Sequence, residues 1–301
     1  MTGWPRRALA WAQRIFTPLA LVFIAVTVWR SRASLEELAA GARIGRLALA
    51  VAIWSCLQFL APLFSRTVLA AADVPVSFRR AWTIHVRRLP ARYLPGGIWH
   101  TVGRAADYHQ FGVQPRRLAL FFFLETGLAP ALALLLGGFC LFVQLGSSRW
   151  GLAGALGMAA GGLGLGLIPV LAHRFMPETG GLTLARYLKA TGIMGLFWLG
   201  AGATFVTYLS AFGEGLLGDG PLAVAGTYLF AWAVGNLTIF APQGLGVFEM
   251  VAGGILHGAL PLGSTAALMA GFRLVVLASD LIAWALGEAG QLLLPLEVEA
   301  P

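Results

Sequence analysis

Residues 118–145 read LALFFFLETGLAPALALLLGGFCLFVQL, a run in which Glu125 is the one charged residue. About 20 consecutive apolar residues are enough for a helix to cross the hydrocarbon core of a bilayer. Similar stretches occur at 16–29, 44–64, 150–172, 190–212, 222–241 and 265–290. The sequence therefore predicts an all-α fold, a polytopic integral membrane protein in which these stretches are the membrane-spanning helices.

The composition agrees with this fold class. Hydrophobic residues make up 58% of the chain and charged residues 11%, and the mean hydropathy of +0.78 excludes a soluble enzyme. Basic residues outnumber acidic ones by 21 to 13, an excess that a polytopic protein needs for its orientation, so it indicates no nucleic-acid partner. Fifteen of the basic residues fall on the side of the N-terminus and five on the other side, which favours a cytoplasmic N-terminus.

Two segments fit neither a loop nor a full span. Residues 77–107 are basic and aromatic and are broken at Pro95-Gly96-Gly97, and residues 241–257 are apolar but open with Pro242-Gln243-Gly244. A membrane tolerates such irregular backbone only where it faces protein or a wet cavity. We therefore expect two re-entrant, broken-helix elements beside seven to eight transmembrane helices.

The two breaks divide the chain evenly. One lies in a first half at about 1–146 and the other in a second half at about 150–301. Paired interruptions in two halves indicate the central site of transporters that are built from inverted repeats. We expect one transmembrane domain over 1–301, with the two breaks meeting near the midplane.

The first break carries a candidate anion site. On a helical wheel one face is cationic, with Arg80, His85, Arg87, Arg88 and Arg92, and the opposite face is apolar, with Trp82, Val86 and Leu89. After the break a half-helix would begin, and its free N–H groups and positive dipole end favour an anion such as phosphate. The alternative is an interfacial helix that is held by anionic lipid head groups. The candidate substrate-binding residues here are Arg87, Arg88, Arg92, Pro95, Gly96, Gly97, His100 and Arg104.

Ionisable residues within apolar stretches form a second group. A charge near the centre of a span costs about 2.5–3.5 kcal/mol on insertion scales, so each needs a partner or a wet cavity. We expect Arg273 to pair with Glu249 or with Glu125 rather than with Asp280 of its own helix. The remaining candidate binding residues surround the second break: Asn236, Pro242, Gly244 and Gly246.

The sequence contains little that indicates catalysis or metal binding. The histidines lack metal-ligand spacing, and no nucleophile elbow or phosphate-binding Walker loop is present. We therefore expect no metal and no cofactor, and we favour a transporter over an enzyme.

The two breaks also carry a resemblance to a known family. RYLPGGIWHTVGR at 92–104, Glu125 in the next span and APQGLGVFE at 241–249 together resemble the lysylphosphatidylglycerol synthetase transmembrane region, a flippase-like membrane domain. In that family the domain stands alone or precedes a soluble aminoacyl-transferase domain, which we do not expect here. The resemblance implies translocation of an anionic phospholipid or a polyprenyl-linked lipid in a bacterial cytoplasmic (inner) membrane.

Several functions remain open from the sequence. We favour lipid translocation with membrane lipids and their anionic head groups as partners. The alternatives are a polytopic membrane enzyme acting on lipid phosphate or a glycosyl-lipid, a carrier for a small anion, and a scaffold for cell-envelope assembly. Cell-envelope biosynthesis enzymes and a second copy of the chain, in a homo-oligomer, are the protein partners that we consider.

Overall fold

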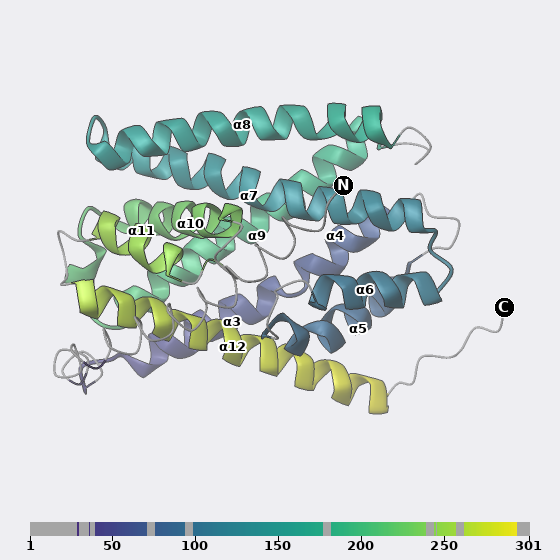
Figure 1. Ribbon diagram of the computed structural model, residues 1–301. Coiled ribbons are helices and arrows are strands. Elements are labelled where there is room, and N and C mark those ends of the chain that lie inside the picture. Colours follow the sequence, from purple (N-terminus) through teal and green to yellow (C-terminus); the bar gives the residue numbers. More distant parts are fainter. Residues whose placement is uncertain are drawn as a thin grey trace, which may run out of the picture. The chain divides into compact units, whose positions relative to one another are not determined.

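The computed structural model describes residues 29, 36, 40–70, 76–93, 99–176, 182–238, 244, 246–256 and 262–293. Within these residues every regular element is a helix (Figure 1). The elements are α3 (Ile44–Leu57), α4 (Leu60–Leu69), α5 (Phe78–Arg88), the 3-10 helix η1 (Pro90–Tyr93), α6 (Trp99–Gln110), α7 (Pro115–Leu145), α8 (Arg149–Phe175), α9 (Leu184–Ser210), the 3-10 helix η3 (Glu214–Leu217), α10 (Pro221–Leu237), α11 (Val247–Leu256) and α12 (Leu262–Leu293).

Five helical stretches are long and apolar enough to cross a membrane, which makes this the architecture of a multi-pass membrane protein. They are Ile44–Leu69, Pro115–Leu145, Arg149–Phe175, Leu184–Ser210 and Ser264–Gly290. Each contains most of one predicted span.

Two further predicted spans have a different outcome. The stretch 16–29 lies, apart from its last residue, outside the residues that the structure describes. Of the stretch 222–241, residues 222–237 lie in α10, which has 17 residues and is shorter than the roughly 20 that cross a bilayer, and residues 239–241 lie outside the described residues. The total number of spans therefore stays a prediction.

The outer surface of α8 shows why these helices suit a membrane. Large apolar side chains point away from the protein, among them Leu156 at 74% and Leu163 at 65% exposure. Water would penalise such a continuous apolar face, whereas lipid tails do not.

The structure divides into two compact units, each drawn from three segments of the chain. Unit 1 comprises Met1–Ala50, Pro130–Leu163 and Ala201–Val275, and unit 2 comprises Val51–Ala129, Gly164–Gly200 and Val276–Pro301. Each unit takes segments from both predicted halves, and the repeat relation between those halves stays a prediction.

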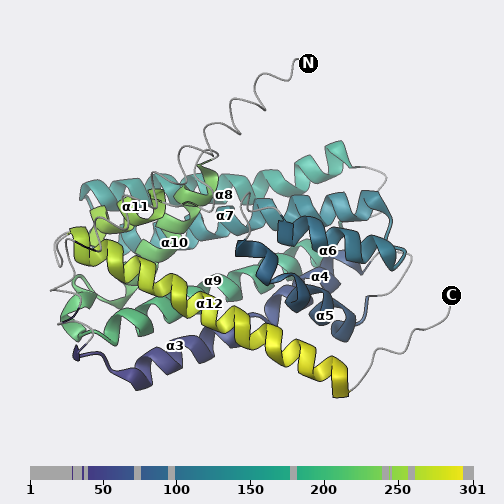
Figure 2. The ribbon, with the colours of Figure 1, turned by 60° about the horizontal axis from the view of Figure 1, so that its bottom comes forward.

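Unit 1 is organised around α10 and α11, which lie side by side (Figures 1 and 2). An aromatic cluster of Phe205, Tyr208, Tyr228 and Phe272 fills its interior, with ring centroids between 4.9 and 6.4 Å apart. The Tyr208 hydroxyl donates to the carbonyl oxygen of Leu268 at 2.8 Å, which satisfies the one polar atom of this buried side chain.

Unit 2 packs α4 against α5 and α5 against α6 (Figure 1). Val86 and Leu89 are fully buried together with Ala283 of α12, and Trp82 packs against them. The ring of Trp82 stacks on that of Phe59 at 4.5 Å. This apolar side of α5 is the one that the helical wheel predicts.

Candidate functional site

The first break separates two short helices of unit 2. The Ser77 side chain caps α5 by accepting from the backbone N–H of Arg80, and the helix ends before Pro90, which cannot donate a helical hydrogen bond. The chain restarts as α6 at Trp99, as the sequence predicts. Pro95, Gly96 and Gly97 lie outside the described residues, and the re-entrant character of this segment stays a prediction.

A chain of hydrogen bonds joins four side chains in the interior of unit 2. Arg92 Nη1 donates to Asp280 Oδ2 at 3.1 Å. Gln58 Nε2 donates to the other carboxylate oxygen of Asp280. The Gln58 carbonyl oxygen lies 3.1 Å from Nε2 of His85. Because an amide oxygen can only accept, His85 Nε2 carries a hydrogen and Nδ1 is the bare nitrogen of the neutral ring.

Gln58 and His85 are the members of this chain that the sequence prediction missed as site residues. Gln58 lies between α3 and α4, where the first described span is interrupted. His85 is only 4% exposed, a burial that its place on the predicted cationic face did not indicate. The sequence did contain one indication of this role, because Gln58 is a polar amide inside the apolar stretch 44–64.

Arg104 and Glu125 form a second polar contact in unit 2. Arg104 Nη2 donates to both carboxylate oxygens of Glu125 at 2.6 Å. The arginine side chain is 1% exposed, and its guanidinium lies 5.4 Å from the centre of the Phe121 ring. Among the residues that the structure describes, Arg104 Nε has no hydrogen-bond partner. A buried donor of this kind is costly unless a ligand completes it.

The histidines of this region are held in their neutral form. Burial, together with the positive charges of Arg104 and Arg92, lowers the pKa of His85 well below its ordinary value. Burial and the same two arginines lower the pKa of His100 to about 2. His85 is linked to Arg92 through Gln58 and Asp280, and α6, which carries Arg104 and His100, packs against both α5 and η1. We call Arg92, Arg104, His85 and His100 the basic cluster.

Two predicted arginines lie outside the basic cluster. Arg87 is more than half exposed and forms an ion pair with Glu288 at 3.4 Å. Arg88 bonds to both carboxylate oxygens of Asp107, with Nε 2.7 Å from Oδ2. The side chain of Arg88 also runs directly over Gly103, where an added Cβ would lie 2.8 Å from Arg88 Cδ.

The second break provides a separate ion pair in unit 1. Glu249 Oε1 accepts from Nε and Nη2 of Arg273 at 3.0 and 2.8 Å, and Oε2 accepts from the backbone N–H of Gly246 at 2.7 Å. Glu249 therefore caps its own helix α11 while it holds Arg273. The expected pairing of Arg273 with Glu249 is present.

The glycines of this break allow its sharp turn. Gly244 and Gly246 have backbone φ values of 68° and 81°, which residues with a Cβ rarely adopt. Gly244 also meets Gly235 of α10 so closely that an added Cβ would lie 2.9 Å from the Gly235 Cα. Asn236 is exposed near the end of α10, and Pro242 lies outside the described residues.

The three acids singled out in apolar stretches each have an arginine partner. Glu125 pairs with Arg104, Glu249 with Arg273 and Asp280 with Arg92. This pairing confirms the physical expectation that charges in such surroundings need a partner. Binding of a substrate by these residues stays a prediction.

Neither metal-ligand geometry nor comparison with known proteins assigns a function to these residues. In the described part of the chain no group of three or more histidine, cysteine or acidic side chains could hold a metal ion. No protein-family model matches the sequence, and no curated protein matches it either. The resemblance to the flippase-like membrane domain therefore rests on its two motifs alone.

Proposed function

We propose that this protein moves a lipid with an anionic head group across the membrane, as a member of the flippase-like family that it resembles. The observation that carries the proposal is the basic cluster, in which Arg92, Arg104 and two neutral histidines lie close together in a multi-pass membrane protein. In the same proposal the membrane is a bacterial cytoplasmic membrane and the N-terminus is cytoplasmic.

The chemistry of the cluster suits a phosphate group. Arg104 uses Nη2 for Glu125, and its Nε remains a buried donor without a partner among the described residues. A guanidinium offers several donors in a rigid fork that matches phosphate oxygens. The start of α6 lies in the same unit, and its free N–H groups favour an anion. A phosphodiester head group would use these donors together.

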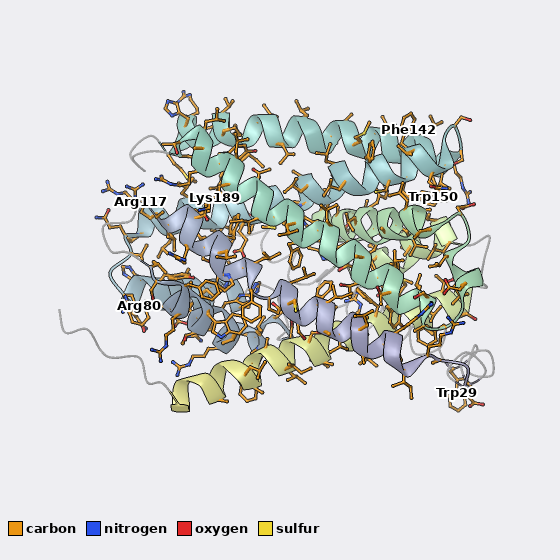
Figure 3. All side chains as sticks on the ribbon, turned by 180° about the vertical axis from the view of Figure 1, so that it is seen from behind. Trp29, Arg80, Arg117, Phe142, Trp150 and Lys189 are labelled. Atoms are coloured by element: carbon orange, nitrogen blue, oxygen red, sulfur yellow. The ribbon has the colours of Figure 1, made fainter. Side chains whose placement is uncertain are left out.

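A lipid is favoured over a free anion by the surroundings of the cluster. The helices expose broad apolar faces, along which lipid tails can remain while the head group moves. Unit 2 also carries exposed and half-exposed basic side chains, of which Arg80, Arg117 and Lys189 lie at the same end of the view in Figure 3. Such groups attract the anionic head groups of a membrane surface.

A leaflet-exchange assay tests the proposal. The full-length protein is reconstituted into phosphatidylcholine liposomes that contain phosphatidylglycerol with an NBD-labelled short acyl chain, and dithionite reports which leaflet holds the label. We expect faster exchange than in protein-free liposomes. Exchange at the protein-free rate would refute the proposed function.

A double variant tests the site without leaving a buried charge unpaired. Arg104→Ala alone would leave Glu125 unpaired, so loss of activity could reflect loss of fold. Arg104→Gln combined with Glu125→Gln removes both charges and should abolish exchange. The control is Arg43→Gln, which disrupts an ion pair with Glu214 whose two side chains are each more than half exposed, and it should exchange lipid normally. Unchanged exchange in the double variant would remove Arg104 from the site.

Two further measurements separate the rival functions. Excess sn-glycerol 3-phosphate, a soluble anion with similar phosphate chemistry, should leave exchange unaffected if the substrate is a lipid. Chromatography of the lipids after the assay should show no chemical change. Uptake of the soluble anion or formation of a new lipid would favour the carrier or the enzyme instead.

A further inference from the structure

The side chain of His85 offers a second, unassigned function in unit 2. Its Nε2 is engaged with Gln58. Its Nδ1 is buried, and within the described residues it has no hydrogen-bond partner. A buried acceptor without a donor is unfavourable. A proton on Nδ1 turns it into a donor, which is favourable only if an acceptor such as a phosphate oxygen arrives with the proton.

The charges around His85 explain why the proton is absent from the unoccupied site. The positive charges of Arg104 on α6 and of Arg92 on η1 disfavour a proton on His85, and both elements pack against α5. The charge of Asp280 reaches it through Gln58, and Glu125 neutralises Arg104. Two arginines are thus matched by two carboxylates, and both histidines are neutral. A proton on His85 would leave the cluster with one uncompensated positive charge in a buried site.

An incoming anion changes this balance. A phosphodiester head group carries one negative charge, so its arrival compensates one proton on His85. We propose that one proton enters the basic cluster together with each anionic head group, and that His85 Nδ1 carries it. This inference rests on the proposed function and adds its energy source, since the lipid and the proton would move together.

The proton balance of the step is simple. Bulk water supplies the proton, one N–H bond forms at Nδ1, and no bond to carbon or phosphorus changes. Arg92 and Gln58 each donate to one carboxylate oxygen of Asp280. On release of the lipid, the proton leaves with it to the other side of the membrane.

Thermodynamic linkage fixes the sign of the effect. If the anion favours protonated His85, the proton favours anion binding by the same factor. The affinity for the anion should therefore rise as pH falls, by up to about tenfold per pH unit for one linked proton. It should level off below the pKa that His85 has in the empty site.

The experiment measures binding and proton uptake together. The purified full-length protein in detergent is titrated calorimetrically with dihexanoyl phosphatidylglycerol, from about pH 5 to about pH 8, where histidines change charge. Two buffers of different ionisation enthalpy give the number of protons taken up per lipid. We expect about one proton at the pH of maximum uptake, together with the pH-dependent affinity.

The variant His85→Gln is the matched control. Its amide N–H can still donate to Gln58, but it cannot accept a proton. We expect lipid binding that is weaker than in the wild type at low pH, takes up no proton and does not depend on pH. His85→Asn provides a second variant if the first does not fold. The wild-type proton count tests the proposal even if neither variant folds.

The outcomes separate this inference from the proposed function. Wild-type binding that is independent of pH and takes up no proton would overturn the inference and leave lipid translocation standing. Undiminished uptake in a folded His85 variant would overturn the assignment to His85. Failure to bind the lipid at every pH, with no leaflet exchange in liposomes, would overturn both.

Discussion

The buried pair of Arg104 and Glu125 should contribute far more to stability than an exposed ion pair of the same unit. Their side chains are 1% and 22% exposed, and they are joined by hydrogen bonds of 2.6 Å. Removing one partner leaves an uncompensated charge in a buried site, which costs about 3–5 kcal/mol. At about 2–4 °C per kcal/mol, Arg104→Gln or Glu125→Gln should lower the midpoint of thermal unfolding by roughly 6–20 °C.

The double variant provides the decisive comparison. Arg104→Gln with Glu125→Gln removes both charges, so no ion is left without its partner. We expect it to lose less than half the stability that either single variant loses. A matched control is Glu288→Gln, which breaks the ion pair between Glu288 and Arg87. In this pair the side chain of Arg87 is 53% exposed and that of Glu288 is 40% exposed. Exposed pairs contribute at most about 1 kcal/mol, so this control should unfold nearly as the wild type does.

The assay follows monodisperse protein by size-exclusion chromatography after heating in detergent. The four variants and the wild type are compared at one pH and one salt concentration. If Glu125→Gln were as mild as Glu288→Gln, or if the losses of the two single variants added up in the double variant, the pair would not be coupled in the way described.

Gly161→Ala should lower the free energy of unfolding by about 1–3 kcal/mol through overpacking, because an added Cβ would lie 2.4 Å from a backbone oxygen of α7. Gly166→Ala on the same helix is the control, since its added Cβ meets open space. In the same thermal assay this control should be neutral or stabilising. Trp150→Phe removes the bond from Nε1 to the carbonyl oxygen of Gly254 at 2.8 Å, and chemical denaturation should show a loss of about 1 kcal/mol. Burial holds the pKa of His85 well below its ordinary value of 6.5 and that of His100 at about 2, so below about pH 6.5 the unfolded chain binds protons on these histidines that the folded chain does not. Each histidine should lower the stability by up to about 1.4 kcal/mol per pH unit, and His85→Gln should remove its own share of this loss and leave that of His100.

The sequence predicted the helices, the need of each acid in an apolar stretch for a partner, and the pairing of Arg273 with Glu249, because these follow from local physics; the pairs Arg104–Glu125 and Arg92–Asp280 were not predicted. A run such as 118–145 has one low-energy arrangement in lipid, and an acid such as Glu249 within an apolar stretch needs a counter-charge. The helix restart at Trp99 follows equally from the proline and glycines before it. These predictions needed no knowledge of the tertiary fold.

The hydrogen-bond chain through Gln58 could not be predicted in the same way. Gln58 and Asp280 are separated by 222 positions in the sequence, and nothing local indicates that an uncharged amide meets that carboxylate. The burial of His85 depends likewise on α6 and α12, which the helical wheel of α5 does not contain. Tertiary packing therefore decides which polar residues of the broken segments form a cluster and which stay at the surface.

An experimental structure in lipid nanodiscs tests the central claim most directly. The protein is reconstituted with phosphatidylglycerol and imaged by electron cryo-microscopy. The account predicts phosphate density within hydrogen-bonding distance of Arg104 Nε, with the acyl tails along an apolar face. A cluster that is closed by other protein side chains, with phosphatidylglycerol bound only at the outer surface, would contradict it.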